Sequence, residues 1–308
     1  MSNSTFIQTA ESWKAEKRQW VKTSSYCTYV NLLNKHILPF FGDGEVLPSE
    51  ETVDKFIRHL LEKGMSANSI RDILLVLKMI LRHGAKLGVW KPMEIKMKLP
   101  SSTKTCSAVP VLASMDQKRL LKYVQEHFSF RNLGILITLH SGLRIGELCA
   151  LQWKDLDIVA DVIRVNKTVS RIYLHDGQEH IYNLTVGAPK TATSVREVPM
   201  SQAILKIVRP LRKIMADDYY VLSNSETPME PRYYREYFRK LLRSLGRSAT
   251  RLHALRHRFA TRCIESKCDY KTVSVILGHS SISTTMDLYV HPGLADKRRC
   301  INRIAKSF

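Results

Sequence analysis

The stretch SGLRIGELCALQW, residues 141–153, stands between a helical part of the chain and a part with a different periodicity. Arg144 follows Ser141 and Gly142 at the predicted start of a helix. Backbone N–H donors are concentrated at the start of a helix, so an arginine there can bind an anion together with these donors. Glu147, three positions on, is predicted to hold the guanidinium of Arg144 in a supporting role, although such pairs are also common on protein surfaces.

Downstream of this stretch the pattern becomes that of β-strands. Three β-rich segments are separated by two turn sequences that contain glycine, and helical patterns then resume; the segments are 163–174, 179–186 and 194–200. We therefore predict a mainly α fold with a small antiparallel β-sheet, in the α+β class.

Residues 1–90 carry only helical patterns, and their apolar stripes predict a small four-helix core with a basic exterior. A polar linker over residues 91–106 follows, rich in lysine and proline. The lysines of this linker would repel one another unless the linker lies along a polyanion. An ordinary solvated linker fits the pattern at least as well. The candidate contacts in it are Lys91, Lys96 and Lys98.

The composition also indicates a polyanionic partner. Lys and Arg total 48 against 28 Asp and Glu, which gives a net charge of +20. Nucleic acid is the commonest partner of such a chain, and an indifferent basic surface is the plain alternative. The six cysteines include no C-x-x-C pair, which argues against a zinc ribbon or a disulfide framework. No signal peptide and no bilayer-spanning apolar run is visible, so we expect a cytoplasmic protein without a membrane partner.

The stretch LHALRHRFATR, residues 252–262, places His253, Arg256 and His257 on one face of a predicted helix. Two histidines one turn apart can bind a metal, but a helical zinc protease site needs H-E-x-x-H, and Ala254 stands where the glutamate would be. We therefore predict no metal site; a helix with histidines on a basic surface is the simpler alternative.

Four motifs, in this order, resemble the tyrosine recombinases, or phage-type integrases. They are SGLRIGELCALQW (141–153), KTATSVREVP (190–199), HALRHRFAT (253–261) and LGHSSISTTMDLYVH (277–291). The resemblance implies a catalytic domain at 107–293, and residues 1–90 resemble the core-binding domain with which it clamps DNA in a C shape. The additional arm-binding domain of many phage integrases is expected to be absent.

The resemblance assigns the family's catalytic roles to Arg144, Lys190, His253, Arg256, His279 and Tyr289. Tyr289 would attack a phosphodiester, His253 would accept its proton, and Lys190 would protonate the leaving 5′-oxygen. The two arginines and His279 would stabilise charge on the phosphate, so no metal, ATP or other cofactor is expected. Lys190 is expected in a tight hairpin between the last two β-rich segments, Lys167 is a rival for its role, and His257 is interpreted as structural.

Two further helices are candidates for contacts with partners. Residues 231–246 interleave aromatic and basic side chains and are either a DNA contact or a solvated basic helix; the candidates are Tyr233, Arg235, Arg239 and Lys240. The tail, residues 294–308, carries apolar residues that a free helix would not expose. In the family such a tail docks on a neighbouring subunit, and folding back on its own domain is the alternative.

The implied partner is double-stranded DNA with inverted-repeat core sites, bound by a homodimer on one site and a homotetramer in the synapse. Accessory DNA-bending proteins would be further partners. We expect a nucleoid-associated protein of bacterial or phage origin that integrates or excises a mobile element or inverts DNA. Xer-type dimer resolution and topoisomerase IB-like relaxation are alternatives, and a DNA-binding protein without activity would leave the six residues unexplained.

Overall fold

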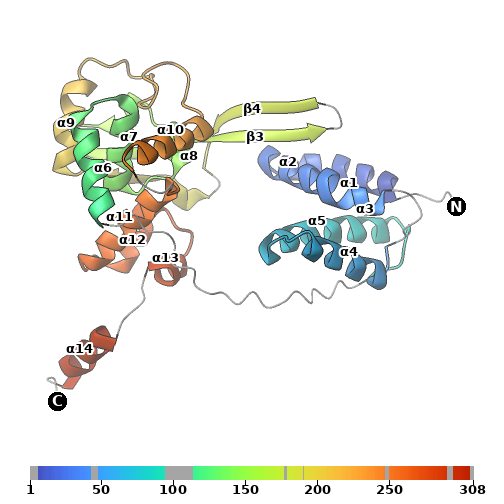
Figure 1. Ribbon diagram of the computed structural model, residues 1–308. Coiled ribbons are helices and arrows are strands. Elements are labelled where there is room, and N and C mark those ends of the chain that lie inside the picture. The colour runs from blue at the N-terminus through green and yellow to red at the C-terminus, as the bar shows by residue number, and fades with distance from the viewer. Residues whose placement is uncertain are drawn as a thin grey trace. The chain divides into compact units, whose positions relative to one another are not determined.

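The computed structural model describes residues 6–42, 48–93, 114–176, 179–189, 191–246, 250–289 and 294–305. The chain divides into two compact units, residues 1–107 with 171–183 and residues 108–170 with 184–308. The described residues are mostly helical and include small antiparallel sheets (Figure 1). The predicted fold class is therefore confirmed.

The first unit is built from helices packed around an aromatic and aliphatic core. Its elements are α1 (Phe6–Trp20), α2 (Thr23–Leu32), a π-helical turn (Leu33–Ile37), α3 (Leu38–Phe41), α4 (Glu50–Glu62) and α5 (Ala67–Lys86). Trp13, Phe41 and Phe56 are among its largest buried side chains. The side chain and backbone of Ser49 exchange hydrogen bonds with those of Thr52 and cap α4.

One helical stretch of the first unit contains a π-helical turn. Residues 23–41 are helical without a break, and the π-helical turn lies between α2 and the short α3. Pro39, near the start of α3, has no backbone N–H with which to continue the α-helical pattern from the preceding turn.

The β-rich segments of the second region form two separate sheets. β1 (Leu156–Asp157), β2 (Val162–Val165) and β5 (Arg196–Pro199) make one three-stranded antiparallel sheet, while β3 (Thr168–Asp176) and β4 (Glu179–Gly187) pair with each other. The outer part of the β3–β4 hairpin groups with the first unit, where Asn31 Nδ2 donates to the Tyr173 carbonyl at 2.7 Å.

Two expectations about these strands were wrong. Residues 163–174 do not form one strand, because β2 and β3 belong to different sheets. The hairpin predicted between residues 179–186 and 194–200 does not form either, because β5 pairs with β2 and not with β4.

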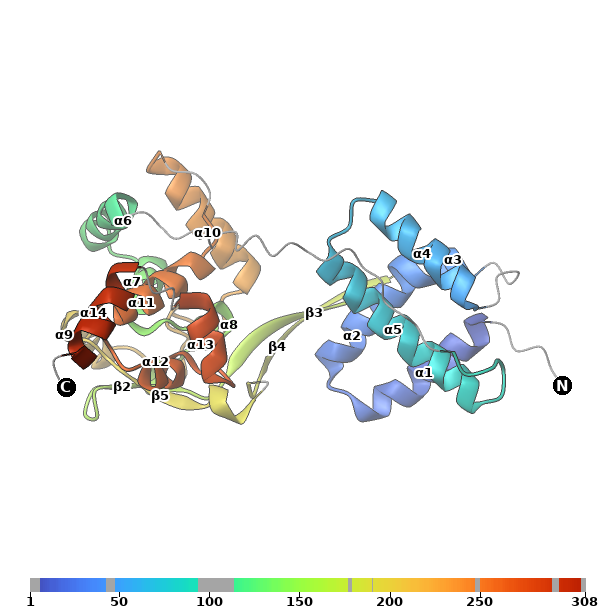
Figure 2. The same cartoon turned by 90° about the horizontal axis from the view of Figure 1, so that it is seen from below.

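The second unit has nine described helices, the first six of which build a core that includes Trp153, Tyr234 and Phe238. They are α6 (Ser114–Glu126), α7 (Phe130–Ser141), α8 (Ile145–Cys149), α9 (Gln202–Arg212), α10 (Pro231–Ser244), α11 (His253–Glu265), α12 (Tyr270–Leu277), α13 (Ile282–Tyr289) and α14 (Leu294–Ala305), with 3₁₀ turns at Trp153–Asp155 and Ala192–Ser194. In both views α11, α12 and α13 lie side by side (Figures 1 and 2). Among the described helices, none combines the length and apolar character required to cross a membrane.

Candidate active site

Arg144 lies at the junction of α7 and α8, and the backbone there determines its position. α7 ends at Gly142, whose φ of +65° favours glycine, and a Cβ at Gly142 would lie 2.6 Å from a ring carbon of Phe259. Arg144 is the extended residue that precedes α8. Its Nη1 donates to Glu147 Oε1 at 2.8 Å, and its backbone N–H donates to Glu147 Oε2 at 2.9 Å. Glu147 therefore orients both the backbone and the side chain of Arg144.

Arg256 comes from α11 and is almost fully buried, with 2% of its surface exposed. Its Nη1 donates to the Gly142 carbonyl at 2.7 Å, and its Nη2 donates to the Leu277 carbonyl at 2.8 Å. Burial is the main cause that lowers the pKa of Arg256 to about 9, and the positive charge of Arg144 acts in the same direction. The guanidinium still carries its charge at neutral pH.

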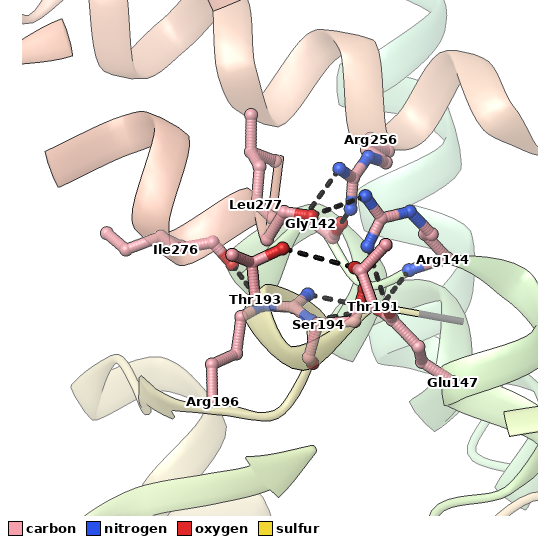
Figure 3. Close-up of polar contacts among 11 residues, drawn as sticks. Gly142, Arg144, Glu147, Thr191, Thr193, Ser194, Arg196, Arg256, Ile276 and Leu277 are labelled. Atoms are coloured by element: carbon pink, nitrogen blue, oxygen red, sulfur yellow. Dashed lines mark hydrogen bonds and ion pairs between the residues drawn. The ribbon is translucent and has the colours of Figure 1, made fainter. Parts of the chain in front are cut away.

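Three successive carbonyls at the C-terminal end of α12 each accept a hydrogen bond from a different arginine (Figure 3). The pairs are Arg196 Nε to Ile276 O at 2.6 Å, Arg256 Nη2 to Leu277 O at 2.8 Å, and Arg144 Nη2 to Gly278 O at 2.7 Å. The last carbonyls of a helix lack intrahelical partners and carry partial negative charge, which suits cations. The end of one helix thus holds three guanidinium groups in place.

Glu147 is a buried carboxylate shared by two arginines. Arg196, the first residue of β5, donates from Nη1 and Nη2 to the two oxygens of Glu147 at 3.1 and 3.0 Å. Burial alone raises the pKa of Glu147, but the hydrogen bonds and charge of Arg196, followed by those of Arg144, outweigh it and hold the pKa below its usual value. The carboxylate therefore stays ionised between the two guanidiniums.

Tyr289 ends α13, and its ring lies close to two histidine rings. The ring centroids of Tyr289 and His257 are 5.4 Å apart, and those of Tyr289 and His279 are 6.5 Å apart with nearly parallel planes. His253 packs edge-on against His257 at 4.5 Å between centroids. His279 Nδ1 lies 2.8 Å from the hydroxyl oxygen of the buried Thr285, which orients the ring.

The electrostatic environment keeps these histidines neutral. Burial, with the positive charge of nearby arginines, lowers the pKa of both His253 and His279 to about 4. Burial raises the pKa of Tyr289, while the charges of Arg256 and Arg144 lower it by less. At neutral pH the cluster therefore holds a protonated phenol together with neutral histidines, one of which can accept its proton.

Of the two candidate lysines, the structure describes only Lys167. Lys190 lies outside the described residues. Lys167, its rival, lies between β2 and β3, where its ammonium group forms an ion pair with Asp155 at 3.2 Å and donates to Gln152. Lys167 is thus already engaged within the protein.

A groove of about 840 Å³ lies beside His253 and is lined by arginines. Of the contacts predicted on α10, Arg235 and Arg239 line this groove, while Tyr233 and Lys240 are exposed outside it. Three further arginines that the sequence analysis did not single out also line it: Arg232, Arg243 and Arg251. Of the linker candidates, Lys91 is exposed, and Lys96 and Lys98 lie outside the described residues.

His257 is buried, and its Nδ1 has no hydrogen-bond partner among the described residues. Within the described ranges, no group of three His, Cys, Asp or Glu side chains is arranged to hold a metal, so His253 and His257 have no third ligand there.

Sequence reasoning missed two residues that shape this site, Arg196 and Thr285. Arg196 alternates with exposed Glu197 and shares the buried face of β5 with Val198. A charged residue on the apolar face of a strand requires a buried partner, and this was the available signal. Thr285 is one of several hydroxyl residues on α13, and the pattern does not distinguish it from its neighbours.

Comparisons with known proteins place these residues in a family context. The model of the phage integrase family matches residues 110–295, and that of the phage integrase N-terminal SAM-like domain matches residues 5–46. The chain is similar to the ICEBs1 integrase of Bacillus subtilis (strain 168), with 27% identity over 286 residues that cover 88% of this chain and 74% of that protein. It is also 25% identical over 273 residues to the tyrosine recombinase XerA of Pyrococcus furiosus, covering 84% of this chain and 86% of XerA.

Solved structures show the same fold. The Tn1549 transposon integrase in complex with transposon right-end DNA has a TM-score of 0.76 and 24% identity, with 98% of this chain and 100% of that chain covered. The lambda integrase in its tetramer bound to a Holliday junction has a TM-score of 0.65 and 14% identity, with 95% and 80% covered.

Proposed function

Because this chain belongs to the phage integrase family and is a site-specific tyrosine recombinase that acts on DNA, we propose that six of its residues perform strand cleavage. They are Arg144, Lys190, His253, Arg256, His279 and Tyr289. The observation that carries this proposal is the anchoring of Arg144 and Arg256 to one helix end, in the same unit as the Tyr289 phenol and the neutral histidines.

The arginines and His279 bind the phosphate. A guanidinium has five N–H donors, and we propose that the donors of Arg144 and Arg256 not used within the protein bind the non-bridging oxygens. If Thr285 donates to His279 Nδ1, the Nε2–H of the neutral ring is available as a further donor. These fixed donors stabilise the charge that gathers on the oxygens in the transition state.

Tyr289 is the nucleophile. Its oxygen forms a bond to phosphorus as the bond from phosphorus to the 5′-oxygen breaks, the phenolic proton passes to neutral His253, and Lys190 gives a proton to the leaving 5′-oxygen. The products are a 3′-phosphotyrosine and a free 5′-hydroxyl. Attack of another 5′-hydroxyl reverses the step, so rejoining uses the energy of the stored phosphodiester and requires neither ATP nor a metal.

DNA is proposed to bind along the segments of the protein that carry positive charge. We propose that residues 1–90, the linker at 91–106 and the arginine groove beside His253 bind the phosphate backbone, with the catalytic domain spanning residues 107–293. A homodimer would occupy one inverted-repeat site and a homotetramer the synapse. We propose that the protein integrates or excises a mobile element in the cytoplasm of a bacterium, and the similarity to an integrase of Bacillus subtilis supports integration among the alternatives.

Covalent trapping tests the proposal. The protein is incubated with nicked duplexes prepared from host DNA, in which a cut strand cannot be rejoined, and the adducts are resolved on denaturing gels. Wild type should form adducts in the presence of a chelator, and Tyr289→Phe should bind DNA normally but form none. Tyr270→Phe, at the exposed start of α12, is the matched control and should behave as wild type. Persistent adducts with Tyr289→Phe would exclude Tyr289 as the nucleophile.

A further inference from the structure

The guanidinium of Arg196 donates its hydrogen bonds to acceptors within the protein. Its Nε donates to the Ile276 carbonyl at 2.6 Å, its Nη1 and Nη2 donate to Glu147, and Nη1 also donates to the Ser194 carbonyl at 3.0 Å. Only 4% of the side chain is exposed. Because a buried ion pair often contributes little to stability, its presence calls for another explanation.

The charges around Glu147 supply that explanation. One carboxylate lies among three guanidiniums, those of Arg144, Arg196 and Arg256. If Glu147 faced Arg144 alone, its negative charge would orient that guanidinium and neutralise it at the same time. With its charge shared by Arg196, Glu147 can orient Arg144 while the cluster keeps a net positive charge for the phosphate.

We propose that Arg196 is a positioning residue for strand cleavage, which shares the carboxylate of Glu147 so that Arg144 is held in place without losing its effective charge. This inference rests on the role proposed for Arg144. Arg196 also joins three parts of the site that are distant in sequence: the turn that follows Lys190, through Ser194; α8, through Glu147; and the end of α12, through Ile276.

The packing around Arg196 agrees with a precise position. Gly278 has a φ of +65°, and a Cβ built on it would lie 2.9 Å from Arg196 Nη1. The guanidinium therefore lies directly against the backbone that precedes His279, with no room for a side chain between them.

A double-mutant cycle tests the charge-sharing role. Single-turnover cleavage of a nicked duplex is measured for Arg196→Met, Glu147→Gln and the double variant. Arg196→Met should be about 10- to 100-fold slower than wild type, as is common when a group that orients a functional residue is removed. The double variant should cleave about 10-fold faster than Arg196→Met, because it no longer leaves Glu147 paired with Arg144 alone. A double variant slower than both single variants, or Arg196→Met at wild-type speed, would overturn the inference.

A second substrate separates this role from the protonation of the leaving group. A duplex with sulfur at the bridging 5′-position has a leaving group that needs no proton, and the defect of Arg196→Met should persist on it. Recovery to wild-type speed on sulfur would mean that Arg196 acts through Lys190, and would overturn the proposed route through Arg144.

Two more variants control for folding. Arg196→Lys keeps the charge but loses the two-pronged contact with Glu147, so it should melt near wild type and still cleave several-fold more slowly; wild-type speed would count against the inference. Arg209→Met removes an arginine that pairs with Asp161 on the surface, and it should match wild type. If wild type forms no adduct through Tyr289, the proposed function is wrong. If wild type forms the adduct and Arg196→Met cleaves at the same rate, only the inference about Arg196 is wrong.

Discussion

Arg144 and Arg256 donate to adjacent carbonyls of the same helix end, Arg144 to Gly278 at 2.7 Å and Arg256 to Leu277 at 2.8 Å. Because the two acceptors are neighbours in the chain, the separation of the guanidiniums is set by backbone geometry and not by flexible side chains. Donors that are already in place before the substrate arrives need no reorganisation when charge develops on the phosphate.

Substitution of Gly278 should disturb this arrangement. Gly278→Ala introduces a Cβ at a φ of +65° and 2.9 Å from Arg196 Nη1, so we expect cleavage to be at least about 10-fold slower. Gly64→Ala is the matched control, because its φ is +70° but, its chain neighbours apart, no atom of the described residues lies within 4 Å of the added Cβ. Both variants should lose stability in thermal melts, but only Gly278→Ala should lose cleavage rate. Equal cleavage by the two variants would show that the α12 end does not position the site.

The acid side of the pH–rate profile should report the lowered pKa values of His253 and His279. A general base works only when it is unprotonated, and the pKa of His253 is lowered from 6.5 to about 4 by burial and by its charged neighbours. Single-turnover cleavage at subsaturating protein should therefore stay high through pH 6.5 and fall only as the pH approaches about 4. DNA binding is measured at each pH as the control. A midpoint near 6.5 would mean that the base titrates as an ordinary histidine.

The two lysines should respond differently to a sulfur leaving group. Lys190→Ala should be slow on ordinary DNA, because the 5′-alkoxide leaves poorly without a proton donor, and should recover most of its rate on the 5′-bridging sulfur substrate. Lys167→Ala loses the ion pair with Asp155, so it should be less stable in thermal melts and show no selective rescue by sulfur. The opposite result, with only Lys167→Ala rescued, would exchange their roles.

The C-terminal helix should couple the subunits. Leu294 and Ile301 on α14 are each 65% exposed, and a neighbouring subunit could cover them. Truncation after Lys297 should leave binding to a single site nearly intact but remove cooperative assembly and strand exchange. Ile301→Asp should reproduce part of this loss, and Asn302→Asp, which adds the same charge at an exposed neighbouring position, should not. Full recombination by the truncated protein would show that the tail does not couple the subunits.

Most of the candidate site could be predicted from the sequence, because its motifs consist of residues that are close together in the chain. The pairing of Arg144 with Glu147 follows from a three-residue spacing, and the position of Arg144 before α8 follows from the glycine turn that precedes it. The helical stripes of residues 6–86 likewise correspond to the buried core of the first unit.

The rest depends on tertiary contacts that no local pattern encodes. Arg196 meets Glu147 only because β5 pairs with β2, and the carbonyls that hold the arginines belong to the backbone, which has no side-chain signature. The division of residues 163–174 between two sheets was likewise missed, because no glycine or proline in this segment marks the end of one strand and the start of the next.

The anchoring of three arginines to the end of α12 also links their positions to one another. Helix ends open more readily than helix interiors, and unwinding of the last turn of α12 would remove one hydrogen bond each from Arg144, Arg196 and Arg256 at the same time. All three guanidiniums would then be held less firmly at once, although each keeps a contact elsewhere in the unit. In the homotetramer proposed above, such an element would let small contacts from a neighbouring subunit change the geometry of a whole active site.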